Sequence, residues 1–433
     1  MTDILRRDAR EAHRQWPVYA LAMVPITVDD VRAAAARLNG ALLRTPCDPS
    51  PSLSELCGCN VLVKREYLHP TGSFKERGAR NALLQLDDDA KARGVIAASA
   101  GNHAQALAYH GRDLGIGVTV VMPKWAPLVK IGRCRAMGAA VILLGDTFDA
   151  ARRHAMQLRD EQNLTYVHGY NDPAVIAGAG TVGLELLEQA PAADAIVIPV
   201  GGGGLVAGTA LAVKAARREC EIFAVEAETA PTLTEALRAG QPVDVDVTPS
   251  IADGLAITRL GDNCFDACRR LVDDVVQVGE ADTARAVLQL LELEKAVVEG
   301  AGATSLAAVT GPLRERLAGK TVVLLLCGGN IDVSVLGRVI ERGLAADGRI
   351  TRVTVRVSDR AGSLARVLDL IGRAGGSVRE VYHDRSFGPP DVGRVDITLV
   401  LDTHDLDHIA EVHAALESAG VRFTVPPRFT ADF

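Results

Sequence analysis

Short apolar segments alternate with helical patterns between residues 60 and 340, and this alternation limits most of the chain to the α/β class. Seven segments are rich in Val, Ile, Leu and Ala: 61–63, 94–98, 118–122, 140–144, 195–200, 222–225 and 321–327. They are continuously apolar, which is typical of parallel strands covered on both faces. We therefore expect two open α/β subdomains, with functional sites at the carboxyl ends of the strands.

The pattern changes after a short polar hinge at 344–348. Arg352–Val357 alternates strictly between polar and apolar residues, as a half-buried strand does. A ferredoxin-like βαββαβ order follows, with a Gly388–Pro390 turn between its middle strands. The sequence thus predicts a main α/β region at 26–343, a linker at 344–350 and a separate domain at 351–433. Residues 1–25 form an N-terminal extension that is disordered, unless Met23 is the true start.

Charge and composition exclude several classes of protein. The net charge of −7 argues against a general nucleic-acid binder, which needs a clustered basic face. No apolar run approaches the ~20 residues that cross a bilayer. Eight scattered cysteines lack a complete zinc spacing, so we expect reduced thiols, no metal site and a cytoplasmic location.

Lys75 is the first candidate for chemistry. It lies in Thr71–Gly78, where a helix begins and where Ser73 can cap it. An amine at a helix N-terminus is disfavoured as a cation, and a lowered pKa is what a Schiff-base lysine needs. The alternative is a surface lysine in a capped first turn.

A glycine tetrad, Gly201–Gly204, follows a buried strand and precedes an apolar helix that begins near Leu205. Glycines at this position let backbone N–H groups surround a phosphate. Gly202, Gly204 and Ala207 also fit a dinucleotide fingerprint, with Glu226 at the distance of a ribose-binding acid. This segment alone does not separate the two readings.

Two further loops follow strands. Ser99–His103 could bind a carboxylate through backbone donors, and Asn102 could give a neutral hydrogen bond or simply cap the helix. Cys327–Asn330 ends the last apolar segment, where a buried thiol before a turn is the plainer interpretation.

Taken together, these motifs resemble the pyridoxal-phosphate-dependent threonine dehydratases of fold type II, which are relatives of serine racemase. The resemblance covers nearly all of residues 26–343, and residues 350–425 resemble an ACT domain. The similar stretches are 64–66, 71–79, 99–105, 171–181, 201–205, 251–254, 327–332 and, in the ACT domain, 359–364.

The resemblance implies a role for each motif. Lys75 would carry the cofactor and act as the base at Cα, while Phe74 would pack on the pyridine ring. Asn102 would contact the ring 3-hydroxyl, and Cys327 would face the pyridine nitrogen, where the family more often has Ser. Further cofactor contacts would come from Gly201, Gly202, Gly203, Gly204, Leu205 and Gly254. The substrate carboxylate would be bound by Ser99, Ala100, Gly101, Asn102 and His103.

Two departures from the family pattern matter. Ala100 replaces the Ser that serine racemases place opposite the lysine, so racemisation should be poor. Thr232 replaces an Asp of the acidic cluster in metal-binding relatives, which removes one carboxylate ligand.

The leading hypothesis is β-elimination from L-threonine, and from L-serine, in a homodimer or homotetramer with an amino-acid effector bound between paired ACT domains. The alternatives are a dehydratase of 3-hydroxyaspartate, a serine racemase-like enzyme, a nicotinamide-dependent oxidoreductase and a pure amino-acid sensor.

Overall fold

The computed structural model describes residues 26–385 and 393–425, so the predicted N-terminal extension and the Gly388–Pro390 turn lie outside the described residues. Its largest sheet has the strand order β1-β2-β10-β7-β8-β9. Every neighbouring pair in this sheet is parallel except β1 and β2. The strands are β1 (Cys47–Pro49), β2 (Asn60–Arg65), β7 (Ala195–Pro199), β8 (Glu221–Ala227), β9 (Asp274–Val278) and β10 (Thr321–Leu326).

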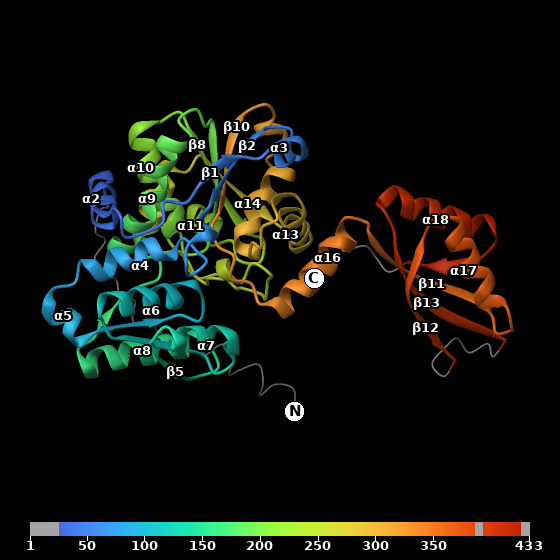
Figure 1. The fold of residues 1–433 in the computed structure, drawn as a ribbon, viewed down its shortest axis with the longest axis horizontal. Helices are drawn as coiled ribbons and strands as arrows, with labels where there is room; N and C mark the ends of the chain where they lie inside the picture. The colour runs from blue at the N-terminus through green and yellow to red at the C-terminus, as the bar shows by residue number, and fades with distance from the viewer. Residues whose placement is uncertain (1–25, 386–392, 426–433) are drawn as a thin grey trace.

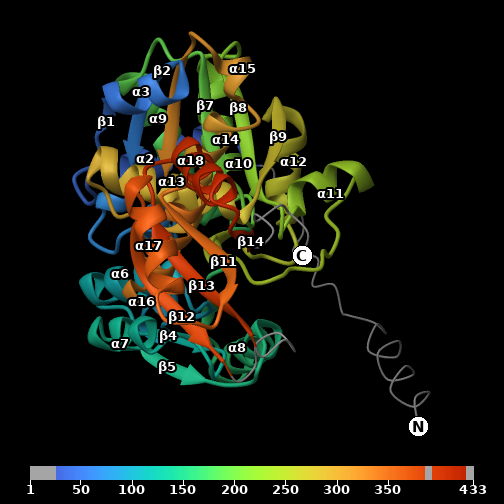
Figure 2. The same cartoon turned by 90° about the vertical axis from the view of Figure 1, so that its right-hand side faces the viewer.

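Successive residues of the central strands belong to different cores. In β7, Ile196 and Ile198 join one buried cluster, whereas Ala195 and Val197 join the other. Both faces of the sheet are thus buried, which explains the continuously apolar strands. The sheet is covered by α3 (Pro51–Cys57), α9 (Pro173–Gln189), α10 (Gly204–Ala216), α12 (Asp262–Leu271), α13 (Glu280–Glu294) and α14 (Gly300–Thr310) (Figures 1 and 2). We call this unit the large lobe.

A second, four-stranded parallel sheet has the order β5-β4-β3-β6. With α6 (Asn102–Leu114), α7 (Leu128–Ala136) and α8 (Phe148–Gln162) it makes the small lobe. Its strands are β3 (Val95–Ala98), β4 (Val118–Met122), β5 (Ala140–Leu143) and β6 (Thr165–Tyr166). Helix α4 (Lys75–Leu84) packs against both α9 and α6, so it joins the two lobes. The expected pair of open α/β subdomains is confirmed.

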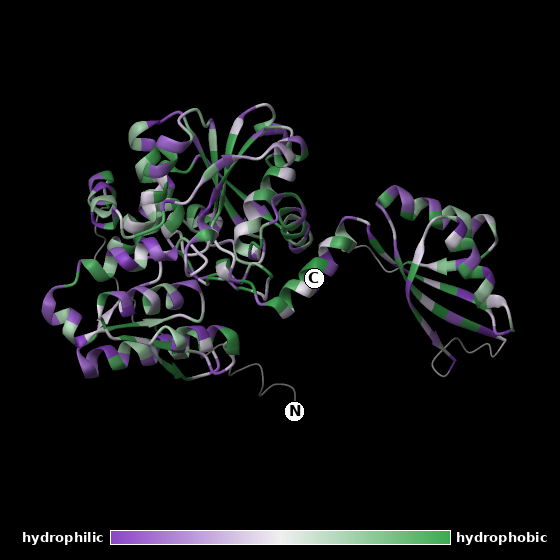
Figure 3. Cartoon of the chain, viewed as in Figure 1, coloured by the Kyte–Doolittle hydropathy of each residue, from purple (hydrophilic) through white to green (hydrophobic). Residues whose placement is uncertain are grey.

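Shorter elements complete the main region. The predicted helix after Thr27 is confirmed as α2 (Val28–Leu38), and Thr27 and Asp30 form a capping box at its start. The others are η1 (Glu66–Leu68), α5 (Asp88–Arg93), α11 (Thr232–Ala239), η2 (Asp253–Leu255) and α15 (Arg314–Leu317). Hydrophilic residues gather on outer helices such as α5 (Figure 3). Within residues 26–385 and 393–425, no helix is long and apolar enough to cross a bilayer.

The C-terminal part has its own sheet and core. Its order along the chain is β11 (Ile350–Ser358), α17 (Ser363–Arg373), β12 (Ser377–Asp384), β13 (Arg394–Asp402), α18 (Leu406–Ser418) and β14 (Arg422–Thr424). The sheet order β12-β13-β11-β14 is antiparallel throughout, which confirms the ferredoxin-like arrangement. A separate apolar cluster fills it, and Figure 1 shows it apart from the lobes, beyond α16 (Val333–Ala346).

The polar hinge was placed too early. Helix α16 continues through Ala346, so Leu344–Ala346, predicted as part of the hinge, are helical. Leu and Ala are strong helix formers, and they extend the helix until Gly348, whose φ of 76° ends it. Three residues, 347–349, separate α16 from β11.

Candidate active site

Lys75 is the first residue of α4 and lies between the two lobes. Its Nζ donates a hydrogen bond to the carbonyl oxygen of Gly169 at 2.6 Å, and Nζ lies 5.0 Å from the centre of the Phe74 ring. Burial lowers the pKa of the amine to about 8, against the weaker opposing influence of Cys264, Cys327 and Glu299. A substantial fraction of this lysine is therefore neutral near pH 8, as a nucleophilic amine requires.

The predicted capping role of Ser73 is wrong. Phe74 occupies the N-cap position of α4, in helical backbone geometry, and no side chain caps the helix. Ser73 instead forms an antiparallel bridge with Gly328, and its Oγ is buried with no hydrogen-bond partner among the described residues. Pairing with a distant segment has overridden the local capping signal.

The glycine tetrad leads from β7 into α10, and each glycine is required by close packing. A Cβ on Gly202 would lie 2.2 Å from the Tyr170 ring, and one on Gly204 would lie 2.8 Å from the Tyr170 carbonyl oxygen. Gly203 has a φ of 91° and abuts Cys264, while Gly201 packs against Gly254 and Leu255. No side chain caps α10, so the backbone N–H groups of its first turn are available to an anion.

The Ser99–His103 loop enters α6 at Asn102, with Gly101 rather than Asn102 at the N-cap. The amide of Asn102 is thus free for other contacts: its Nδ2 donates to Glu299 Oε1 at 2.8 Å, and its Oδ1 accepts from Asn330 Nδ2 at 3.0 Å. Ser99 Oγ accepts from the N–H of Gly101, and Ala100 is half-buried. As in α10, no side chain occupies the N-terminus of this helix.

His103 differs from the expected carboxylate-binding side chain. Its Nε2 lies 3.1 Å from the carbonyl oxygen of Val167, and its ring packs on Gly169. Burial, reinforced by Lys75, lowers the pKa of His103 to about 3, so the imidazole is neutral and supplies no cation. Only its backbone N–H, in the first turn of α6, is suited to an anion.

Cys327 ends β10 beside the lysine loop. Its carbonyl oxygen accepts from the N–H of Phe74 at 3.0 Å, and the N–H of Gly329 donates to the Gly72 carbonyl at 2.9 Å. The side chain is buried, and burial raises the pKa of the thiol well above its usual value, so the group is neutral. The two loops therefore hold Lys75 and Cys327 at one site.

Sequence reasoning missed four residues of this site: Tyr170, Cys264, Glu299 and Asn330. Burial, with Asp253 nearby, raises the pKa of the Glu299 carboxyl to about 7. Asn330 follows the Cys327 motif but was given no role. The only sequence signal for Glu299 is an acid directly before the glycine-rich start of α14 at Gly300.

Glu226 is not positioned as the dinucleotide reading expected. Its carboxylate accepts hydrogen bonds from the N–H groups of Leu233 and Thr234, at 2.6 and 3.1 Å, and from the hydroxyl of Thr234. It thereby satisfies donors at the start of α11 instead of facing the glycine tetrad. Among the described residues, no group of His, Cys, Asp and Glu has the arrangement of a metal site.

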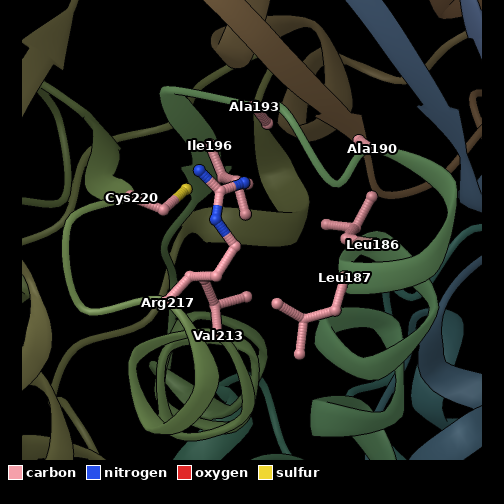
Figure 4. A pocket seen from close by; sticks show the side chains of 8 residues that line it. All are labelled: Leu186, Leu187, Ala190, Ala193, Ile196, Val213, Arg217 and Cys220. Atoms are coloured by element: carbon pink, nitrogen blue, oxygen red, sulfur yellow. The ribbon is translucent and has the colours of Figure 1, made fainter.

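A small apolar pocket elsewhere does not compete with this site. It lies between the C-terminal ends of α9 and α10, next to Ile196 at the start of β7 (Figure 4). Its volume of about 10 Å³ has room for about one water molecule. Lys75 and the glycine tetrad lie instead at the carboxyl ends of the strands, as expected for an α/β protein.

Comparison with known proteins decides the family. Residues 38–328 match the model described as "Pyridoxal-phosphate dependent enzyme". The chain belongs to this family. Residues 351–418 of this pyridoxal-phosphate dependent enzyme match the ACT domain model.

The relatives of this enzyme agree with one another. The L-threonine ammonia-lyase of Thermotoga maritima is 41% identical, over 91% of this chain and 98% of its own length. The threonine deaminase of the organism abbreviated T.th. has a TM-score of 0.67 and 40% identity, covering 71% of this chain and 99% of its own. Serine racemase from Dictyostelium discoideum has a TM-score of 0.67 and 34% identity, with the same coverage.

The site of this pyridoxal-phosphate dependent enzyme has the features that the cofactor requires. It offers an amine whose pKa is lowered to about 8, which suits a covalent bond to an aldehyde. The glycine tetrad, packed so closely that no Cβ fits, leads into an uncapped helix N-terminus that suits a phosphate.

Proposed function

We propose that the enzyme converts L-threonine to 2-oxobutanoate and ammonia, and L-serine to pyruvate and ammonia. The observation that carries this proposal is the match to the L-threonine ammonia-lyase of Thermotoga maritima over nearly the full length of both chains. The Lys75 site supports it, since elimination of a β-hydroxyl begins with removal of the Cα proton by a neutral base.

We propose these roles for the residues of the site. Lys75 carries the cofactor, Phe74 packs on its ring and Asn102 donates to the ring 3-oxygen. Cys327 faces the pyridine nitrogen, and its neutral thiol does not keep that nitrogen protonated as an Asp would. The phosphate is bound by N–H groups of Gly201, Gly202, Gly203, Gly204 and Leu205, with Gly254 packed against Gly201.

When bound, pyridoxal phosphate supplies an electron sink that acidifies Cα of the substrate. Lys75 Nζ accepts the Cα proton, and the Gly169 carbonyl holds the amine in place. Backbone N–H groups of Ser99–His103 bind and orient the substrate carboxylate. The β-hydroxyl leaves as water, and hydrolysis of the resulting enamine releases ammonia and the 2-oxo acid.

Ala100 distinguishes this reaction from racemisation. Its methyl group cannot carry a proton, so no side chain at this position delivers one to the opposite face of Cα. We therefore assign β-elimination to the site, although the structural relatives include serine racemases.

The direct test uses purified enzyme loaded with the cofactor. We expect a violet absorption band and formation of 2-oxobutanoate from L-threonine, with no change in nicotinamide absorbance. A violet band with product only from 3-hydroxyaspartate would replace the substrate and keep the family. Equal rates of racemisation and elimination would contradict the role given to Ala100.

We also propose that the ACT domain binds an amino-acid effector in a homo-oligomer. Gly375, in the loop after α17, has a φ of 88°, and a Cβ there would lie 3.1 Å from His408 Nε2. This tight glycine loop lets a ligand approach the backbone closely.

Truncation after Asp347 is expected to preserve 2-oxobutanoate formation and to abolish its response to branched-chain amino acids. The cut follows the end of α16, which packs on α13 and belongs to the main region. Activity should be measured over a range of effector concentrations for full-length and truncated enzyme. A truncated enzyme that responds like the full-length one would contradict regulation through this domain.

A further inference from the structure

Both ends of the Asn102 amide are held by residues with no role in the sequence-based assignment. Its Oδ1 accepts from Asn330, and its Nδ2 donates to Glu299, which fixes the orientation of the amide. Nδ2 carries a second hydrogen, so the amide has one N–H left to offer a ligand. Asn102 therefore presents a donor.

The structure makes room for the contact between Glu299 and Asn102. A Cβ on Gly328 would lie 2.3 Å from Glu299 Oε1 and 3.2 Å from Asn102 Nδ2, so only glycine fits there. The N–H of Glu299 donates to the carbonyl of Gly328 at 3.1 Å, and this holds the acid beside the loop. Glu299 is 4% exposed, so its carboxyl depends on protein partners such as Asn102.

The contact also crosses between the lobes. Asn102 begins α6 of the small lobe, whereas Glu299 precedes α14 of the large lobe. Two further contacts join the lobes beside it: Arg133 to Asn330 Oδ1 at 3.0 Å, and Lys130 to Asp253 at 2.8 Å. The orientation of Asn102 thus depends on residues of the opposite lobe.

We propose that Glu299 is a positioning residue, whose carboxyl holds Asn102 so that its remaining amide N–H points at the ring oxygen of the cofactor. This proposal rests on the proposed function, in which Asn102 contacts that oxygen. A donor to the ionised ring oxygen favours the ionised form. Without it, the proton shared within the lysine-linked cofactor moves from the lysine nitrogen to the ring oxygen, and the violet band gives way to a near-ultraviolet band.

The test compares the ratio of the violet to the near-ultraviolet band in cofactor-loaded variants at one pH. Glu299→Ala is expected to lower this ratio about tenfold, the size expected for losing a hydrogen bond to a charged group. Glu299→Gln keeps an oxygen acceptor, so its ratio should stay within about twofold of wild type. Glu294→Ala is the control, since Glu294 is also buried but binds Ser50 and Arg65.

A double-mutant cycle distinguishes positioning from a direct effect. In an Asn102→Ala background, Glu299→Ala should not change the ratio further, because the residue it positions is gone. Additive effects would overturn the proposal, as would an unchanged ratio in Glu299→Ala or a Glu299→Gln variant that behaves like Glu299→Ala.

Two further measurements keep the test decisive. If Glu299→Ala does not fold, Asn330→Ala releases the other end of the amide and should lower the ratio in the same direction; no change there overturns the proposal. A wild-type enzyme without a violet band would reject the proposed function itself, an outcome distinct from a normal band that is insensitive to Glu299.

Discussion

Replacement of Lys75 by alanine is expected to lower 2-oxobutanoate formation from L-threonine by about 10⁴-fold or more. The substitution removes both the amine that holds the cofactor and the base that accepts the Cα proton. The violet band of the bound cofactor should disappear at the same time. The measurement is the visible spectrum of purified protein together with a 2-oxo acid assay.

Two controls separate chemistry from folding. Lys75→Arg keeps a positive charge but cannot become neutral, since arginine stays protonated in proteins, so it should be as inactive as Lys75→Ala. Lys91→Ala, on the exposed surface of α5, should retain wild-type activity. A Lys75→Ala enzyme that keeps the violet band and a wild-type rate would show that another amine does this work.

The fold was predictable where burial leaves a mark on each strand by itself. The apolar runs at 118–122 and 195–200 correspond to β4 and β7 because strands buried on both faces need apolar residues at every position. Strand β9 (Asp274–Val278) was missed because it is half-buried at the edge of its sheet and carries Asp and Gln. Strand β1 was missed because it has only three residues and ends in Pro49.

The site was predictable only where a local pattern encodes it. A glycine tetrad or a lysine at a helix start can be recognised within a few residues. Glu299 and Asn330 meet Asn102 across separations of 197 and 228 residues, and nothing near them in the sequence marks that contact. The wrong capping role of Ser73 has the same cause, since its partner Gly328 comes from the other end of the main region.

Loss of the Arg77 side chain is expected to be the most destabilising single change in the chain. Arg77 is 2% exposed and lies two residues after Lys75. Its guanidinium binds Glu66 at 2.7 and 2.8 Å and Glu185 at 2.6 and 3.0 Å, and it also contacts Thr181. Burial alone would raise the pKa of Glu66, but Arg77 holds it well below its usual value, so the acid is ionised.

Arg77→Met should therefore lower the free energy of unfolding by about 3–5 kcal/mol, because it leaves buried carboxylates without their cation. The measurement is urea unfolding of the variant and of Arg44→Met. Arg44 pairs with Glu188 on the same helix as Glu185, but both side chains are more than half exposed, so this control should lose less than about 1 kcal/mol.

The large loss follows from the position of the cluster rather than from the number of ion pairs. Glu66, Arg77 and Glu185 join the end of β2 to α4 and α9, so the guanidinium fixes the start of the helix that presents Lys75. Arg77→Met should consequently also weaken retention of the cofactor, measured as the violet band left after dialysis. Equal stability losses in Arg77→Met and Arg44→Met would show that the buried acids find other partners.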